Sequence, residues 1–220
     1  MKGIKFGELH SFNDLNLILS ACEITPATPK ETYVELPGGD GSLDFTEVHG
    51  EVKYNDREEC KFTFTMNPSD SLSDEDWENK KRVVSNKLNG KYFQKIILDS
   101  DPGYYYQGRC RIDEYASDRR IRKIVVSARL KPYKYKKDVT EISFTLSSTA
   151  KTVILTNSRK TVVPEITCSA DNQKIVFGSV TKTLSKGTHK ILDIQLVEGD
   201  NSIKISGSGT MKFAYQEADL

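Results

Sequence analysis

Apolar and polar residues alternate along most of the chain, which is the two-residue period of a β-strand with one buried face. The clearest run covers residues 60–66, where lysine and threonine occupy one face. The other face is apolar and is made of Cys60, Phe62, Phe64 and Met66. We expect this run to pair with residues 51–54 around a turn at 55–58, forming a hairpin with one buried face and one solvent-exposed face.

The stretch before this hairpin alternates too, but it is interrupted. Residues 31–36 and 42–45 have strand character, and five turn-forming residues separate them. These five are Pro37, Gly38, Gly39, Asp40 and Gly41. Proline has no backbone donor and glycine loses the most backbone entropy on ordering, so neither strand continues through them. The pattern predicts two strands joined by a loop, preceded by short strands within residues 4–9 and 15–19.

One stretch has helical spacing instead. Ser73 is placed as an N-cap, and three carboxylates follow it in the first turn, where the helix dipole favours negative charge. Trp77, Val84 and Leu88 form one narrow apolar stripe, and the helix ends before Gly90. We interpret the acidic cluster as helix capping rather than as a metal or catalytic site.

Three further strands are expected at residues 92–98, 104–115 and 124–130. An arginine group lies in and after the second strand: Arg109, Arg111, Arg119, Arg120 and Arg122. A phosphate-binding patch is one interpretation, but intervening acids and strict alternation favour a solvated strand face. Three adjacent strand tyrosines divide between both faces, which predicts core packing together with contact to a neighbouring chain. They are Tyr104, Tyr105 and Tyr106.

The pattern of apolar and polar residues changes after residues 131–137. This segment is charged, contains a proline and marks a domain boundary. Seven or so short alternating runs follow, separated by turn-forming residues and without a helical window. This pattern is typical of an antiparallel β-sandwich. We therefore predict a mainly β protein with one α-helix and two domains, residues 1–133 and 138–220.

Composition adds few constraints. The 220 residues include 32 Lys and Arg against 31 Asp and Glu, a net charge of +1, so no global field favours nucleic acid or a membrane surface. No run approaches the roughly 18 apolar residues of a membrane span, and none near the start resembles a signal peptide. We expect a soluble protein made in the cytoplasm, without specific nucleic-acid binding.

Cysteine and histidine give no site. The cysteines lie far apart, and Cys60, Cys110 and Cys168 fall on apolar strand faces, which favours small buried thiols in a reducing compartment. A disulfide framework or a zinc site is the alternative. His10, His49 and His189 show no ligand spacing to each other or to the cysteines. We expect no metal and no cofactor.

Motifs of known enzyme classes are also missing from the sequence. No nucleophile elbow, P-loop, dinucleotide fingerprint or zinc-protease helix is present. The loop at residues 37–41 resembles a phosphate cradle in glycine content alone, because no lysine and helix follow it. Contact with another chain is its better-supported role, and we expect no enzyme.

Several motifs occur in an order that is specific when taken together. The stretch from Glu35 to Glu47 precedes a run ending Phe-Thr-Phe, and later come Asp-Pro-Gly-Tyr-Tyr-Tyr-Gln-Gly-Arg at 101–109 and Lys-Pro-Tyr-Lys-Tyr at 131–135. Val-Pro-Glu-Ile-Thr at 163–167 and Gly-Asp-Asn-Ser-Ile at 199–203 complete the series. In this order, over nearly the whole chain, the sequence resembles the distal tail protein (Dit) family of long, flexible-tailed bacteriophages.

The resemblance implies an N-terminal barrel-type domain with one helix and a protruding hairpin, followed by a galectin-like β-sandwich. In that family the first domain forms a hexameric ring that joins the tail tube to the tail-associated hub protein of the baseplate, in some members with receptor-binding proteins. A phage or prophage virion is the implied location, after assembly in the host cytoplasm. The implied subunit contacts are the loop at 37–41 and the tyrosines at 104–106.

A carbohydrate-binding or receptor-binding module is the alternative function. Sugar platforms need exposed aromatic rings, but residues 138–220 contain only Phe144, Phe177, Phe213 and Tyr215. All four lie in alternating apolar runs, which places them in the core. The short second domain therefore argues against this alternative.

Overall fold

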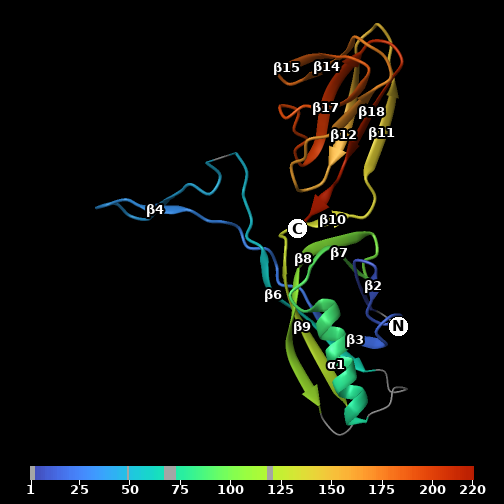
Figure 1. Ribbon diagram of the computed structural model, residues 1–220. Helices are drawn as coiled ribbons and strands as arrows, with labels where there is room; N and C mark the ends of the chain where they lie inside the picture. The colour runs from blue at the N-terminus through green and yellow to red at the C-terminus, as the bar shows by residue number, and fades with distance from the viewer. Residues whose placement is uncertain (1–2, 49, 67–72, 118–120) are drawn as a thin grey trace. The chain divides into compact units, whose positions relative to one another are not determined.

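The computed structural model describes residues 3–48, 50–66, 73–117 and 121–220. Within these ranges the protein is mainly β-structure with one helix, which confirms the predicted fold class (Figure 1). Two compact units divide the chain: unit 1 contains Met1–Lys134 and Leu220, and unit 2 contains Tyr135–Asp219. Arg119 and Arg120 from the arginine group, and His49, lie outside the described residues.

Unit 1 is built on an antiparallel sheet with the strand order β2-β1-β7-β8-β9-β6-β3. The strands are β1 (Ile4–Phe6), β2 (Leu9–His10), β3 (Leu17–Glu23), β6 (Arg57–Met66), β7 (Tyr92–Leu98), β8 (Tyr104–Ser117) and β9 (Arg122–Leu130). Alternate residues of β6 and β9 are fully buried, as the sequence pattern predicted. A β-bulge between Ile112 and Glu114 in β8 breaks this alternation late in the strand.

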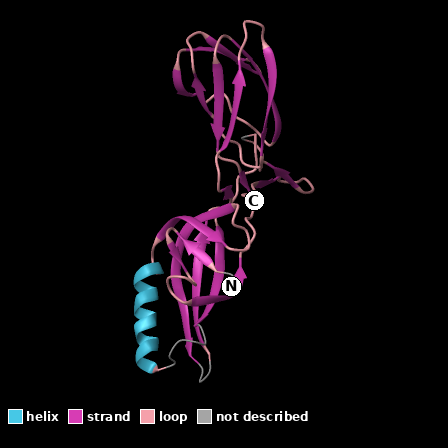
Figure 2. Cartoon of the chain, turned by 90° about the vertical axis from the view of Figure 1, so that its right-hand side faces the viewer, coloured by secondary structure: helices cyan, strands magenta, loops and turns pink. Residues whose placement is uncertain are grey.

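The helix α1 (Asp74–Leu88) packs on this core, and Figure 2 shows it lying along one side of the sheet. The Ser73 hydroxyl accepts a hydrogen bond from the Asp76 amide at 3.1 Å, as expected of an N-cap. Trp77, Val84 and Leu88 are buried in the same cluster as the strand side chains. The predicted capping residue and apolar stripe are both confirmed.

The hairpin predicted for residues 51–54 and 60–66 is wrong. Strand β6 pairs with β3 and β9 instead, and of residues 51–54 only Tyr54 forms a β-bridge, with Pro29. The difference is explained by Arg57, which is buried. Its guanidinium donates to the carbonyls of Pro132 at 2.9 Å and Thr25 at 3.0 Å. These tertiary bonds begin the strand where the sequence pattern suggested a turn.

Residues 31–48 form a narrow two-stranded arm, visible around the β4 label in Figure 1. Its strands β4 (Tyr33–Glu35) and β5 (Ser42–Asp44) pair with each other in a separate antiparallel sheet. The two strands and the loop between them were predicted. We call residues 31–48 the arm.

Unit 2 is a pair of four-stranded antiparallel sheets, ordered β11-β18-β13-β16 and β12-β17-β14-β15. The strands are β11 (Thr140–Thr145), β12 (Lys151–Asn157), β13 (Glu165–Cys168), β14 (Gln173–Phe177), β15 (Val180–Leu184), β16 (Gly187–Lys190), β17 (Gly199–Ser206) and β18 (Thr210–Tyr215). The short strands β10 (Lys134–Lys136) and β19 (Ala218–Asp219) complete the list. Apolar side chains from both sheets form one core cluster.

Two details of unit 2 differ from the sequence pattern. Strands β15 and β16 are mostly polar and were not predicted. Conversely, Ile194 and Leu196 are fully buried but belong to no strand, since only Leu196 forms an isolated bridge, with Val162. Apolar alternation therefore marks burial more reliably than it marks strand pairing.

Candidate functional site

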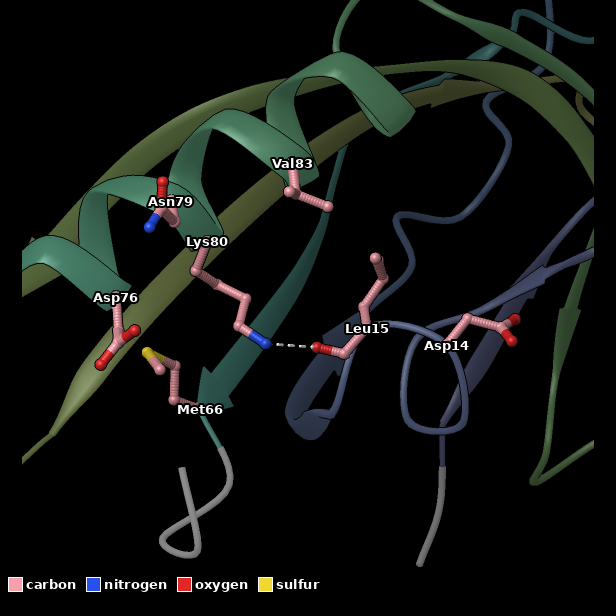
Figure 3. Close-up of a pocket in the computed structure, with 7 residues that line it drawn as sticks. All are labelled: Asp14, Leu15, Met66, Asp76, Asn79, Lys80 and Val83. Atoms are coloured by element: carbon pink, nitrogen blue, oxygen red, sulfur yellow. Dashed lines mark hydrogen bonds between the residues drawn. The ribbon is translucent and has the colours of Figure 1, made fainter. Parts of the chain in front are cut away.

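A pocket of about 370 Å³ lies between α1 and the turn before β3. Its lining is mixed: Asp14, Leu15, Met66, Asp76, Asn79, Lys80 and Val83. Figure 3 shows Lys80 pointing across it, where the ammonium donates to the Leu15 carbonyl at 3.0 Å. The pocket's one cationic group therefore joins the helix to the adjacent turn, and no nucleophile and base meet in this lining.

The described ranges contain neither a cluster of metal-binding side chains nor a membrane-spanning helix. No group of three or more His, Cys, Asp or Glu side chains there has the arrangement of a metal site. Nor does any helix in those ranges combine the length and the apolar character of a membrane span.

The arm carries exposed apolar side chains on one face. In the β4–β5 ladder Val34 lies opposite Leu43, and Phe45 follows on the same face, where its amide donates to the Thr32 carbonyl. These three apolar side chains are 48%, 46% and 39% exposed. An isolated two-stranded hairpin is marginal in water, so an uncovered apolar face of this kind is suited to another surface.

The opposite face of the arm is acidic. Tyr33 lies opposite Asp44, and Glu35 shares their face. The pKa of Tyr33 is raised above its usual value, chiefly by the charge of Asp44 and then by that of Glu31. Residues 31–48 carry five carboxylates and no Lys or Arg, and among the described residues none of these carboxylates is in an ion pair.

The tip of the arm contains the five residues predicted as a subunit-interface loop. Gly38 and Gly41 have φ values of 79° and 77°, a region that favours glycine, and an added Cβ would meet nothing within 4 Å at either position. Glycine is therefore favoured at these two positions by the backbone conformation and not by a lack of space for a side chain. Pro37, Gly39 and Asp40 are exposed, which leaves the loop open to a partner.

A groove of about 680 Å³ crosses the outer face of β8 and β9. Its lining includes Gly108, where an added Cβ would collide with the Arg129 carbonyl oxygen and with Leu130, so glycine permits the close approach of β8 to β9 here. Its cationic residues are Arg109, Arg111, Arg129 and Lys131. We call this the cationic groove.

The two strands of the cationic groove differ in the partners of their cations. On the β9 side Asp56 lies 3.2 Å from Arg129 and 3.4 Å from Lys131, which neutralises these cations. On β8 Arg109, directly opposite Arg129 in the ladder, bonds the Gly90 carbonyl and has no carboxylate partner among the described residues, and Arg111 lies 3.7 Å from Asp113. The less neutralised cations of the groove are thus those of β8.

The predicted arginine group is not assembled as one patch. Arg109 and Arg111 face outward, as expected, but Arg122 is buried beside Trp77 and bonds Asp74 at 2.9 Å and the Ser73 carbonyl at 2.8 Å. It serves the helix start rather than a ligand. Strand alternation in the sequence could not reveal this, because the helix that Arg122 contacts lies about 48 residues away.

The predicted tyrosine contact divides between both faces of β8. Tyr105 is buried, and Lys95 lies 5.4 Å from its ring centroid. Tyr104 is half-buried under the Lys134 ammonium at 4.6 Å. Tyr106 packs against the core with the guanidinium of Arg57 5.8 Å from its ring. All three rings take part in packing within unit 1.

The aromatic residues of 138–220 are in or against the core of unit 2. Phe213 and Tyr215 are buried, and Phe144 and Phe177 pack on the same cluster. The four placements agree with the sequence pattern. No aromatic ring of residues 138–220 is thus presented as a sugar platform.

The chain matches no protein-family model and no curated protein. Its fold is similar to the crystal structure of the SPP1 Dit protein, which is described as a paradigm of the hub adsorption apparatus in phages that infect Gram-positive bacteria. The TM-score is 0.69 with 12% sequence identity, and the alignment covers 100% of both chains. At this identity the likeness concerns the fold, so the chain has the fold of the SPP1 Dit protein over its whole length.

Proposed function

We propose that the chain is a structural component of a bacteriophage tail tip that assembles as a ring, hexameric by analogy, between the tail tube and the tail-associated hub protein. The observation that carries the proposal is the structural match to the SPP1 Dit protein over the full length of both chains. The exposed arm supports it, since a monomer has no evident use for an uncovered apolar hairpin. The proposed location is the virion, and the proposed role is not enzymatic.

Within this proposal the arm is the subunit contact. Its loop, residues 37–41, and its apolar face reach a neighbouring copy. The tyrosines at 104–106 contribute more modestly, because Tyr105 is 7% exposed and its neighbours are half-buried. Unit 2 is the galectin-like sandwich that faces outward and is available for receptor-binding proteins.

Assembly is tested with purified full-length chain, alone and with the tail tube protein of the same phage. Light scattering and negative-stain microscopy should find a closed ring in at least one of the two samples. Shortening residues 38–41 to a two-residue turn should leave the monomer folded and abolish the ring. A strict monomer in both samples would contradict the proposal, as would a gene neighbourhood without tail genes.

A carbohydrate-binding module remains the second candidate from the sequence. The buried aromatic side chains of unit 2 weigh against it. A glycan array probed with the full chain should give no hits, and a specific hit would revive this function.

A further inference from the structure

The acidic face of the arm and the β8 side of the cationic groove present charges at the same spacing. Because Tyr33 lies opposite Asp44 and Glu35 opposite Ser42, Glu35 and Asp44 are diagonal neighbours in the ladder. Diagonal neighbours in an antiparallel pair are about 7–8 Å apart. The arm therefore carries two carboxylates at that separation on one face.

The arginines match this separation. Arg109 and Arg111 are two positions apart in β8, with regular pairing to β9 on both sides, so they project from the same face. Two residues along a strand span about 7 Å. Two carboxylates of the arm can thus meet two guanidinium groups one to one, and arginine–carboxylate pairs are among the strongest charge-assisted hydrogen bonds.

We propose, on the basis of the ring proposed above, that the acidic face of the arm of one copy binds Arg109 and Arg111 on the β8 side of the cationic groove of the next copy. Glu35 and Asp44 are the arm residues that pair with these arginines. The partner of this surface is a second copy of the chain.

A second copy fits because arm and groove are different surfaces of one chain. A contact between two different surfaces is heterologous, and a heterologous contact that repeats by rotation generates a closed ring. Each copy then uses its arm once and its groove once. An isologous contact between the acidic faces of two arms is disfavoured, because it would place carboxylates against carboxylates.

Lys80 and Lys81 of the helix are less suitable partners for the carboxylates of the arm, since their ammonium groups already bind other groups of the same chain. Lys80 bonds the Leu15 carbonyl, and Lys81 pairs with Glu78 and lies over the Trp77 ring. Binding a carboxylate there would break these contacts. Arg111 is better placed, because its side chain is 70% exposed and Asp113, at 3.7 Å, lies beyond hydrogen-bond distance of its guanidinium.

A buried hydroxyl without a hydrogen-bond partner in the same groove supports the proposal that a carboxylate binds there. Ser127 lies opposite Arg111 in the β8–β9 ladder, lines the groove, and its Oγ has no hydrogen-bond partner among the described residues. Buried polar atoms are nearly always paired. A carboxylate held by Arg111 is an acceptor of the kind that this hydroxyl lacks.

The test reverses charge on each surface in the full-length chain. The arm variant carries Glu35→Lys and Asp44→Lys, and the groove variant carries Arg109→Glu and Arg111→Glu. Their four positions are exposed, so thermal unfolding should show that both variants fold. A control reverses two exposed helix cations, Arg82→Glu and Lys87→Glu.

Association is measured by sedimentation over a concentration series, with the tail tube protein added if the ring requires it. Each variant alone should associate at least about 100-fold more weakly than the unmodified chain, because juxtaposed like charges cost several kcal/mol. The control should associate like the unmodified chain. An equal mixture of the arm and groove variants should restore the ring, since alternating copies again place opposite charges together.

Comparing the mixture with a further variant distinguishes a contact between two copies from a contact within one chain. A quadruple variant that carries all four reversals restores complementarity in both cases. Rescue in the quadruple variant without rescue in the mixture would mean that the arm binds its own groove, which overturns the proposal. A ring that tolerates every reversal would overturn this contact and leave the proposed tail function standing, whereas an unmodified chain that never associates would overturn both.

Discussion

The guanidinium of Arg122 lies over the indole of Trp77, with 5.5 Å between the guanidinium carbon and the ring centroid. The same group bonds Asp74 and the Ser73 carbonyl at the beginning of α1. One arginine of β9 therefore fixes both the N-terminus of the helix and its largest buried side chain.

Replacing Arg122 with methionine should lower the free energy of unfolding by about 1–2 kcal/mol, because a cation–π contact and two charge-assisted bonds are lost while most of the apolar contact remains. Urea denaturation followed by the fluorescence of Trp77 measures the change. Arg82→Met on the exposed side of the helix is the control and should shift stability by no more than about 0.5 kcal/mol. Equal effects at the two positions would contradict the role assigned to Arg122.

Gly108→Ala should destabilise unit 1 by about 1–3 kcal/mol, since the added Cβ would press on the backbone of Arg129 and Leu130 and force the strands apart. Gly103→Ala is the matched control, because an added Cβ there meets nothing within 4 Å. Chemical denaturation of both variants checks the difference. Similar stability of both would show that β8 and β9 separate easily at this point.

The four thiols should differ in reactivity. Burial raises the pKa of Cys110 to about 12, so its thiolate is scarce at neutral pH, and Cys60 and Cys168 are buried as well. Cys22 is exposed, although partial burial of its sulfur raises its pKa and slows the reaction. Alkylation of the native chain with iodoacetamide, followed by mass spectrometry, should label Cys22 first. Early labelling of Cys110 would mean that unit 1 opens readily.

Unit 2 should lose stability in acid through Glu217. Burial alone would raise the pKa of this carboxyl, but hydrogen bonds from Thr140, Lys136 and Ser158 outweigh burial and lower it. A carboxyl with a lowered folded pKa stabilises the fold above its unfolded pKa, near 4.5, and this contribution disappears as pH falls through the folded value. Thermal unfolding between neutral pH and pH 3 should therefore show a decline that Glu217→Gln reduces. An identical decline in the variant would assign the acid sensitivity to other groups.

The arm should be the first site of cleavage by a glutamyl endopeptidase, because its Glu31, Glu35 and Glu47 are exposed and its strands pair only with each other. Trypsin should leave it intact, since residues 31–52 contain no Lys or Arg. Time-resolved mass spectrometry of the digests identifies the sites. Assembly into a ring should protect the arm, and unchanged cleavage in the ring would separate the arm from the contact.

The sequence pattern predicted local features well because they depend on local physics. Ser73 caps the helix through its own hydroxyl, and Cys60, Phe62 and Phe64 are buried because one face of β6 lies on the core. The loop of the arm follows from backbone conformations that glycine favours, at Gly38 and Gly41. None of these features needs information from distant residues.

Features that depend on distant partners could not be predicted in this way. Arg57 begins β6 because of carbonyls 32 and 75 residues away, and no pattern around Arg57 encodes them. The cationic groove likewise combines Gly108 and Arg109 of β8 with Arg129 of β9. Outward-facing arginines were recognised, but which of them share a surface depends on sheet order.

The placement of arm and groove on different elements has a consequence for assembly kinetics. An incomplete row of copies ends in one unsatisfied arm and one unsatisfied groove, so every open intermediate can dissociate one contact at a time. The closing contact joins two ends that are already tethered, at an effective concentration of the order of millimolar. Closure should therefore be cooperative, with monomers and complete rings dominating at equilibrium and partial rings scarce.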